Sequence, residues 1–233
     1  MNESAVYLQP AFILQHRPYR ETSQLLEVYT RDFGIVSVLA KGVRQEKSKL
    51  AGVLLPFTLL HISYLDKNEL KILTRAEFVR NHAPQRLALY CGFYLNELLQ
   101  RFLFRNDPHP ELFAAYQACL GELCNDLHIE QTLRYFELEL LEACGYAVDL
   151  TADHNGQPVD KLKRYNFQPT VGLIADGNGC ISGVSLQMLN VKAPLLGATL
   201  TEAKRFLRAM LDEHLLGKPM QSREVLAKMI KYL

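Results

Sequence analysis

Short apolar runs separated by turn-forming residues fill the first 80 residues and predict a β-rich region. We expect five strands, at Ala11–Leu14, Leu25–Thr30, Ile35–Leu39, Val53–Leu65 and Glu69–Arg75. Gly34 suits the turn before the third strand because glycine adopts positive φ easily, and Asp66–Asn68 is the expected turn before the last. Pro56 predicts a bend or an edge position in the fourth strand. Five strands without a clear helix predict a small barrel of the OB-fold type. The face and loops of an OB-fold bind single-stranded nucleic acid.

Beyond Pro84 the apolar positions recur with the helical period of about 3.6 residues, which predicts a mainly helical region. We expect helices at Arg86–Arg105, Glu111–Leu123, Ile129–Cys144, Thr201–Leu211 and Ser222–Ile230. The aromatic stripe of the first of these helices, which includes Tyr94 and Phe102, is assigned to the core. Thr199 or Thr201 is the expected N-cap of the fourth helix.

A turn-rich excursion at residues 150–180 interrupts the helical region. Tyr165–Ala175 is expected to form a short strand or ribbon, and Asp176–Gly179 a tight turn. The predicted fold class is therefore α+β. A five-stranded OB-fold barrel is expected at residues 1–80, followed at residues 81–233 by a mainly α-helical domain that contains this small turn-rich and β insertion.

The composition is that of an ordinary globular protein, with 48% apolar and 22% charged residues among 233. No apolar run approaches the ~20 residues that a membrane span needs, and the first residues lack the pattern of a signal peptide. We therefore expect a soluble cytoplasmic protein without membrane contact. The five cysteines contain no Cys-x-x-Cys pair, so buried free thiols are favoured over disulfides or a zinc site.

Charge is unevenly distributed along the chain, although the net charge is only +1. Residues 1–80 hold 11 basic and 8 acidic side chains, residues 81–150 hold 4 and 10, and residues 151–233 hold 11 and 7. This pattern indicates at least two functional surfaces. Four basic residues follow the third strand closely, at Lys41, Arg44, Lys47 and Lys49. Such a loop suits a phosphate backbone, but it also suits a hairpin loop that its charges keep solvated, and the spacing alone favours the solvated loop.

Known motifs for phosphate binding, nucleophilic catalysis and zinc catalysis do not occur in the sequence. Glu139 and Glu142 share a helical face, where a solvated acidic surface is favoured over a metal site. No motif supports Asp149 and Asp153 as a catalytic pair. The sequence therefore predicts no enzyme, no cofactor and no metal.

Arg134 is one of four basic residues in the acidic middle region, and it lies on a helix rich in apolar residues. An arginine beside an apolar groove is suited to the capture of a peptide carboxylate. A local salt bridge to Glu130 or Glu137, at helical spacing, is at least as well supported by the sequence.

Eleven segments, in their order and spacing, resemble those of a known family. In the first region they are Ala11–Leu14, Arg17–Ser23, Ala40–Arg44 and Leu55–Phe57. In the middle and at the end they are Tyr94–Leu99, Leu133–Glu137 with Leu140 and Leu141, Gly145–Tyr146, Gly156–Val159, Ala203–Phe206 and Gly217–Glu224. With these segments the chain is similar to the RecO family of bacterial recombination mediators over most of its length.

The resemblance implies an N-terminal OB-fold followed by a helical domain, with binding of single- and double-stranded DNA and annealing of complementary strands. It also implies help for RecA in loading onto strands coated by single-strand-binding protein, together with RecR, in the cytoplasm at the nucleoid. Some members carry a four-cysteine zinc module after the Gly-Tyr pair. Residues 151–156 of this chain contain no cysteine, so zinc is not expected.

The resemblance also makes the basic loop the expected DNA surface. The candidate DNA contacts are Lys41, Arg44, Lys47, Lys49, Arg17, Arg20, Arg31 and Tyr19. Among the aromatic residues Tyr19 is the favoured base-stacking side chain, whereas most of Tyr29, Phe33 and Phe57 are expected in the barrel core.

The resemblance assigns Arg134, with Phe136 and Leu140 as pocket wall, to the acidic C-terminal tail of single-strand-binding protein. An adaptor that docks on this tail, with secondary DNA contacts, is the alternative function. A hydrolase with an unfamiliar motif is a third class.

Overall fold

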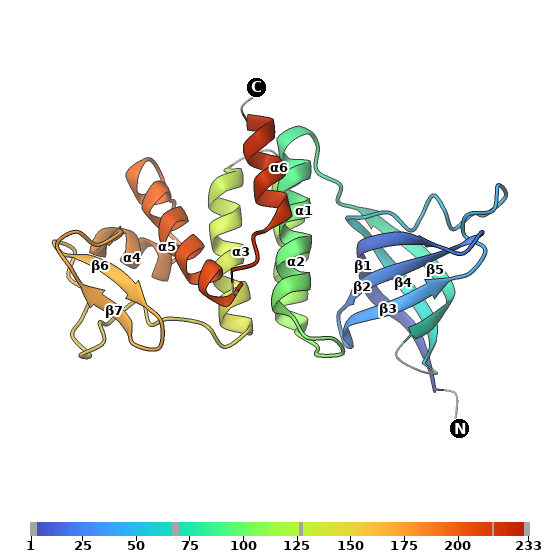
Figure 1. Cartoon of the computed structure of the whole chain (residues 1–233), viewed down its shortest axis with the longest axis horizontal. Helices are drawn as coiled ribbons and strands as arrows, with labels where there is room; N and C mark the ends of the chain where they lie inside the picture. The colour runs from blue at the N-terminus through green and yellow to red at the C-terminus, as the bar shows by residue number, and fades with distance from the viewer. Residues whose placement is uncertain (1–3, 67–69, 126–127, 216, 231–233) are drawn as a thin grey trace. The chain divides into compact units, whose positions relative to one another are not determined.

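The computed structural model describes residues 4–66, 70–125, 128–215 and 217–230, and the chain forms two compact units. One unit comprises residues 1–126 and 222–233, and the other comprises residues 127–221. The first unit contains a barrel and three helices, and the second contains three helices and a small sheet (Figure 1). Within the described ranges, no helix is both long enough and apolar enough to cross a membrane.

Five strands close into a barrel in the order β1-β2-β3-β5-β4 (Figure 1). They are β1 (Ser4–Tyr19), β2 (Ser23–Thr30), β3 (Gly34–Ala40), β4 (Thr58–Asp66) and β5 (Leu70–Asn81). Alternate residues of each strand fill the interior, so that Leu26 and Val28 of β2 lie opposite Val38 and Val36 of β3. The α+β class and the five-stranded OB-fold barrel are confirmed.

The strand boundaries differ from the predicted ones in two ways: some polar residues belong to a strand, and some apolar residues lie in a loop. The first strand is 16 residues long, because its first half pairs with β4 and its polar second half pairs with β2. The apolar run at residues 53–57 is not strand: Leu54 turns into the barrel core from a loop, and Phe57 has a φ of +63°. Of the predicted turn at 66–68, Asp66 ends β4 and the other two residues lie outside the described ranges.

Two helices, α1 (Arg86–Phe102) and α2 (Pro110–Cys124), pack with the barrel in the first unit. In the aromatic stripe of α1, Tyr94 and Phe102 are buried as predicted, whereas Tyr90 is half-buried. The Asn96 amide donates to the Leu14 carbonyl at 2.9 Å and accepts from the Tyr116 hydroxyl at 2.5 Å. This buried contact therefore joins β1, α1 and α2.

The last helix, α6 (Gln221–Ile230), belongs to the first unit and packs against α1. The Glu97 carboxylate accepts from the Ser222 backbone nitrogen at 2.8 Å and from its hydroxyl at 2.6 Å. The Arg223 guanidinium lies 5.6 Å from the centre of the Tyr94 ring. These contacts fix the beginning of α6 on α1.

The second unit contains α3 (Ile129–Ala143), α4 (Gly183–Asn190), α5 (Ala198–His214) and a sheet of order β7-β6-β8. Its strands are β6 (Arg164–Gln168), β7 (Gly172–Ala175) and β8 (Ile181–Ser182). The expected ribbon is the β6–β7 hairpin, whereas α4 was not predicted. The predicted threonine cap of α5 is wrong, because Gly197 occupies the N-cap and the Thr201 hydroxyl donates to its carbonyl.

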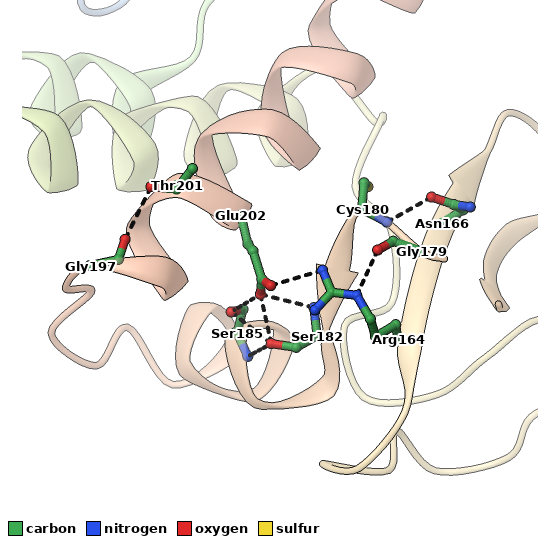
Figure 2. Close-up of polar contacts among 9 residues, drawn as sticks. All are labelled: Arg164, Asn166, Gly179, Cys180, Ser182, Ser185, Gly197, Thr201 and Glu202. Carbon is green, nitrogen blue, oxygen red and sulfur yellow. Dashed lines mark hydrogen bonds and ion pairs between the residues drawn. The ribbon is translucent and has the colours of Figure 1, made fainter. Parts of the chain in front are cut away.

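One carboxylate of α5, that of Glu202, joins α4 to the small sheet (Figure 2). One of its oxygens accepts from the hydroxyls of Ser182 and Ser185 at 2.7 and 2.6 Å, and the other meets the Arg164 guanidinium at 2.8 Å. Burial raises the pKa of this carboxyl, but the hydrogen bonds outweigh burial and lower the pKa to about 2. Glu202 is therefore charged at neutral pH and holds β6, β8 and α4 together.

None of the five cysteines forms a disulfide in the described ranges, and only two of their thiols are fully buried. Cys91 and Cys119 lie in the core of the first unit, Cys144 and Cys180 are half-buried, and Cys124 is exposed. The expectation of buried thiols is therefore wrong for Cys124, which lies on the last turn of α2.

Candidate nucleic-acid interface

One end of the barrel brings together two basic segments that are apart in sequence. Tyr19, the last residue of β1, pairs with Ser23, and Ala40 at the end of β3 pairs with Gln24. The β1–β2 turn therefore lies beside the start of the loop that follows β3. The Arg44 backbone nitrogen donates to the Thr22 carbonyl at 2.8 Å, which bonds the loop to the turn.

The loop at residues 41–57 is anchored by its apolar residues and exposes its basic ones. Val43 and Leu54 are 1% and 2% exposed in the barrel core, and Leu50 and Val53 pack against them. The four basic side chains of the loop are exposed: Lys41, Arg44, Lys47 and Lys49. In the part of the chain that the structure describes, none of these four forms an ion pair. Their charge is therefore available to an anion.

Arg17, Tyr19 and Arg20 add to this surface from β1 and its turn. Arg17 and Arg20 are exposed, and the Arg20 guanidinium lies 5.3 Å from the centre of the half-buried Tyr19 ring. The Arg44 guanidinium donates to the Arg20 carbonyl at 3.2 Å. We call this surface the basic end and define it as Arg17, Tyr19, Arg20, Lys41, Arg44, Lys47 and Lys49.

Arg31 does not belong to the basic end. It lies in the β2–β3 turn, at the far end of the eight-residue strand β2, which is roughly 25 Å long at ~3.3 Å per residue. Its guanidinium binds both oxygens of Asp32, at 2.8 and 3.0 Å. Hydrogen bonds from Arg31 and then from Gln9 lower the pKa of Asp32, so the arginine is neutralised by a charged neighbour.

Tyr29 and Phe57 are buried, but against helices and not in the expected barrel core, and Phe33 is 38% exposed. Tyr29 packs against Phe113 of α2, and Phe57 against Phe93 of α1. Neither of these two rings is open to a base, whereas Phe33 is exposed but lies in the β2–β3 turn with Arg31, away from the basic end. Tyr19 is therefore the stacking candidate of the basic end.

A groove beside the basic end was not found by the sequence analysis. It has a volume of about 480 Å³ and lies between the outer side of β1–β3 and the end of α1. Its lining includes Arg17, Glu27, Phe104 and Arg105. The only sequence signal for the groove is the pair Phe104 and Arg105 at the end of the predicted helix Arg86–Arg105. The helical period placed this pair in the helix, so it was not considered as a site. We call this groove the Phe104 groove.

The candidate residues for tail binding are buried within the second unit. The Arg134 side chain is 7% exposed, and its guanidinium lies 2.5 Å from the Glu137 carboxylate. Phe136 and Leu140 are 2% and 0% exposed. Of the two interpretations of Arg134, the structure contains the local salt bridge, while Glu130 pairs instead with Lys204 at 2.6 Å.

Three of the four acidic residues considered for chemistry have structural partners, and the fourth, Glu142, is exposed. Glu139 pairs with Lys192 at 2.5 Å, and the Asp149 carboxylate accepts from the Thr151 backbone and hydroxyl at 2.8 and 2.6 Å. The Asp153 carboxylate accepts from two backbone nitrogens of its own turn, at 2.9 and 3.0 Å. These carboxylates therefore stabilise turns and helix contacts.

Comparisons with known proteins cover nearly the whole chain. Two family models match it, "Recombination protein O N terminal" over residues 1–82 and "Recombination protein O C terminal" over residues 84–224. A DNA repair protein RecO of Haemophilus influenzae is 40% identical over 231 residues, which cover 97% of this chain and 98% of that protein.

Two further relatives give the same result. The DNA repair protein RecO of Photobacterium profundum is 40% identical over 223 residues, which cover 94% of each chain. That of Methylococcus capsulatus is 39% identical over 226 residues, which cover 95% of this chain and 93% of the other. With both family models and full-length relatives in agreement with the barrel and the helices described above, the chain belongs to the RecO family of DNA repair proteins.

Proposed function

We propose that this chain is a recombination mediator that binds single- and double-stranded DNA and anneals complementary strands. With RecR, it assists the loading of RecA onto single strands coated by single-strand-binding protein. The observation that supports the proposal most is the basic end: six cationic side chains on one loop, one turn and the end of β1, anchored by Val43 and Leu54. Family membership supports the same function.

Annealing needs no covalent chemistry, which fits a chain without a catalytic motif. Two complementary strands repel each other through their phosphates, and cations that neutralise these phosphates lower the repulsion. Lysine and arginine contact phosphates whatever the base sequence, so the basic end suits strands of any sequence. The bases stay free to pair while the backbones are held.

The proposal is tested by the salt dependence of DNA binding. Fluorescence anisotropy of a labelled single-stranded oligonucleotide is measured from low to high salt for wild type and for Lys41→Glu/Lys47→Glu/Lys49→Glu. These three lysines form no ion pair in the described ranges, and Arg44, which bonds to the turn, is left in place. We expect weaker binding by the variant and a log K against log salt plot that is shallower by about 0.7 for each phosphate that the variant no longer neutralises.

The matched control is Lys41→Arg/Lys47→Arg/Lys49→Arg, which keeps every charge and should keep the wild-type slope. Equal binding by the glutamate variant and wild type would move the site away from the basic end, toward the basic C-terminal region. Absence of binding by wild type at low salt would contradict the proposal.

The proposal includes docking on the acidic C-terminal tail of single-strand-binding protein through Arg134, Phe136 and Leu140. Because the Arg134 guanidinium meets Glu137 through one terminal nitrogen, a tail carboxylate would have to share the guanidinium with Glu137 or replace Glu137 as its partner. The alternative function, an adaptor with secondary DNA contacts, predicts that the triple glutamate variant still promotes RecA loading with RecR. The mediator predicts that this variant loses it.

A further inference from the structure

Phe104 presents an aromatic ring to solvent beside a cavity and two arginines. The residue is 74% exposed and follows the end of α1 by two positions. The Phe104 groove has a volume of about 480 Å³, within the range of about 300–1,000 Å³ that is typical of sites for small ligands. A single exposed phenylalanine is common on protein surfaces, but a phenylalanine that lines a groove suits a ligand with a flat apolar face.

The backbone around Phe104 is fixed to the barrel. The backbone of Arg105 forms an isolated parallel β-bridge with Ile35 at the start of β3, and the Asn106 backbone nitrogen donates to the Ile35 carbonyl at 3.1 Å. Gly34 lies so close to this segment that a Cβ on it would stand 2.2 Å from the Asp107 carbonyl oxygen. The backbone that carries the ring is therefore fixed before any ligand arrives, which lowers the entropic cost of binding.

The polar side chains of the groove are arranged for a ligand that carries an anion. Arg105 is held by Glu27 at 3.0 Å and by the Ser37 hydroxyl, so it neutralises the one carboxylate of the lining. Arg17 forms no ion pair within the described ranges, which leaves the groove with a positive charge. The amides of Gln15 and Gln100 also line it and can both donate to and accept from a base edge.

We infer that the Phe104 groove binds one unpaired nucleotide of a single-stranded DNA, with the base stacked on Phe104 and its phosphate near Arg17. This inference rests on the proposed function, which it deepens. A base can stack on an aromatic side chain only when it is free of its duplex neighbours, so the groove selects single strands. The basic end, by contrast, neutralises phosphates of either form.

The groove is continuous with the basic end along β1. Gln15, Arg17 and Tyr19 pair in regular register with Glu27, Leu25 and Ser23, and therefore share the outer side of the barrel. Successive members of this row are about 6.7 Å apart. A DNA single strand that runs along β1 thus passes from Phe104 over Arg17 to the Tyr19–Arg20 pair and the basic loop.

The test compares Phe104→Ala with Tyr7→Ala, which removes an equally exposed ring (73%) from the other half of β1. Binding of a single strand that contains 2-aminopurine, and of the duplex of the same sequence, is followed by anisotropy and by 2-aminopurine fluorescence. We expect Phe104→Ala to weaken single-strand binding about 5- to 150-fold, to lose the quenching on binding, and to leave duplex binding and the salt slope unchanged. Tyr7→Ala should behave as wild type, and Phe104→Trp should restore quenching.

Both variants remove an exposed ring, and their far-ultraviolet circular dichroism should equal that of wild type. Single-strand affinity and quenching that survive in Phe104→Ala would overturn the subsite while the proposed DNA binding stands. Equal losses for single strand and duplex would also overturn it. Failure of wild type to bind any DNA would instead contradict the proposed function, and the inference with it.

Discussion

Arg134 and Glu137 form an ion pair in which neither side chain is open to solvent. Their side chains are 7% and 1% exposed on α3, so the pair stabilises the second unit only while both members are present. Removing one partner of a buried pair leaves a charge without its counter-ion, which costs about 3–5 kcal/mol. We therefore expect Arg134→Ala to lower the free energy of unfolding by about that amount, measured by urea denaturation followed by circular dichroism.

The double variant Arg134→Met/Glu137→Leu is the control, because a well-packed apolar pair commonly replaces a buried ion pair without loss of stability. Weaker tail binding by Arg134→Ala alone could arise from unfolding as readily as from the missing guanidinium. The double variant, if folded, separates the two causes. A single variant as stable as wild type would contradict the burial of this pair.

Glu202 makes the stability of the second unit depend on pH. Its pKa is about 2 in the folded chain and 4.5 as the ordinary value, so the charged form is favoured by folding. The stabilisation is complete above pH 4.5 and disappears as the pH falls toward 2. We expect Glu202→Gln to melt at a lower temperature than wild type at pH 7, with the difference shrinking below pH 4.5.

Thermal melts at several pH values, followed by circular dichroism, check this expectation. Glu142→Gln is the matched control, because Glu142 is exposed in the same unit and its side chain forms no hydrogen bond or ion pair within the described ranges. A difference between Glu202→Gln and wild type that grows as the pH falls from 4.5 to 2 would contradict the sign of the effect.

At the level of elements, the contact between the β2–β3 turn and the segment after α1 depends on Gly34. Its φ is +65°, and a Cβ would lie 2.2 Å from the Asp107 carbonyl oxygen. The positive φ and the close carbonyl oxygen both disfavour a side chain at this position. Gly34→Ala should therefore lower the free energy of unfolding by about 2 kcal/mol or more and displace residues 103–107. Hydrogen exchange of the Asn106 amide, which bonds to Ile35, should become faster.

Gly52→Ala is the control in the same unit, since no atom lies within 4 Å of its added Cβ and its φ is not positive. Its unfolding midpoint should match that of wild type. If Gly34→Ala behaved in the same way, the close approach of Asp107 would be wrong.

Elements whose apolar residues follow one helical or strand period could be predicted from the sequence. Elements that depend on contacts with residues distant in sequence could not. The helices at 86, 111 and 129 and the strands at 25 and 35 were predicted within a few residues, because their apolar faces match one period. Residues 53–57 look like a strand but contain Leu54, whose apolar side chain fills the barrel from a loop. Short α4 depends on Ser182 as its cap and on Glu202, a contact that no local pattern shows.

The candidate site was predicted in part. The sequence named the cationic residues of the basic end, since charge in a loop between strands is visible without a structure. It could not show that Arg31 lies at the other end of β2 or that Phe104 borders a groove. Both facts depend on register and on packing between segments far apart in sequence.

At the scale of the whole molecule, the change from strand to helix and the division into packed units fall at different places. The period changes near Pro84, and the family models divide the chain between residues 82 and 84. The packed units instead keep α1 and α2 with the barrel, through contacts such as that of Asn96 with Leu14. The predicted domains, 1–80 and 81–233, stay a prediction about folding, because the units are defined by packing alone.

The return of α6 to the first unit has a consequence for the order of synthesis. Residues 127–221 are an insertion between α2 and α6, so the ribosome makes the barrel, α1 and α2 long before their last helix exists. Throughout that interval the nascent chain carries Glu97 without Ser222 and Tyr94 without Arg223. The first unit to be translated is therefore the last to be completed, and a chain that stops within the insertion leaves the α1 surface open to non-native contacts.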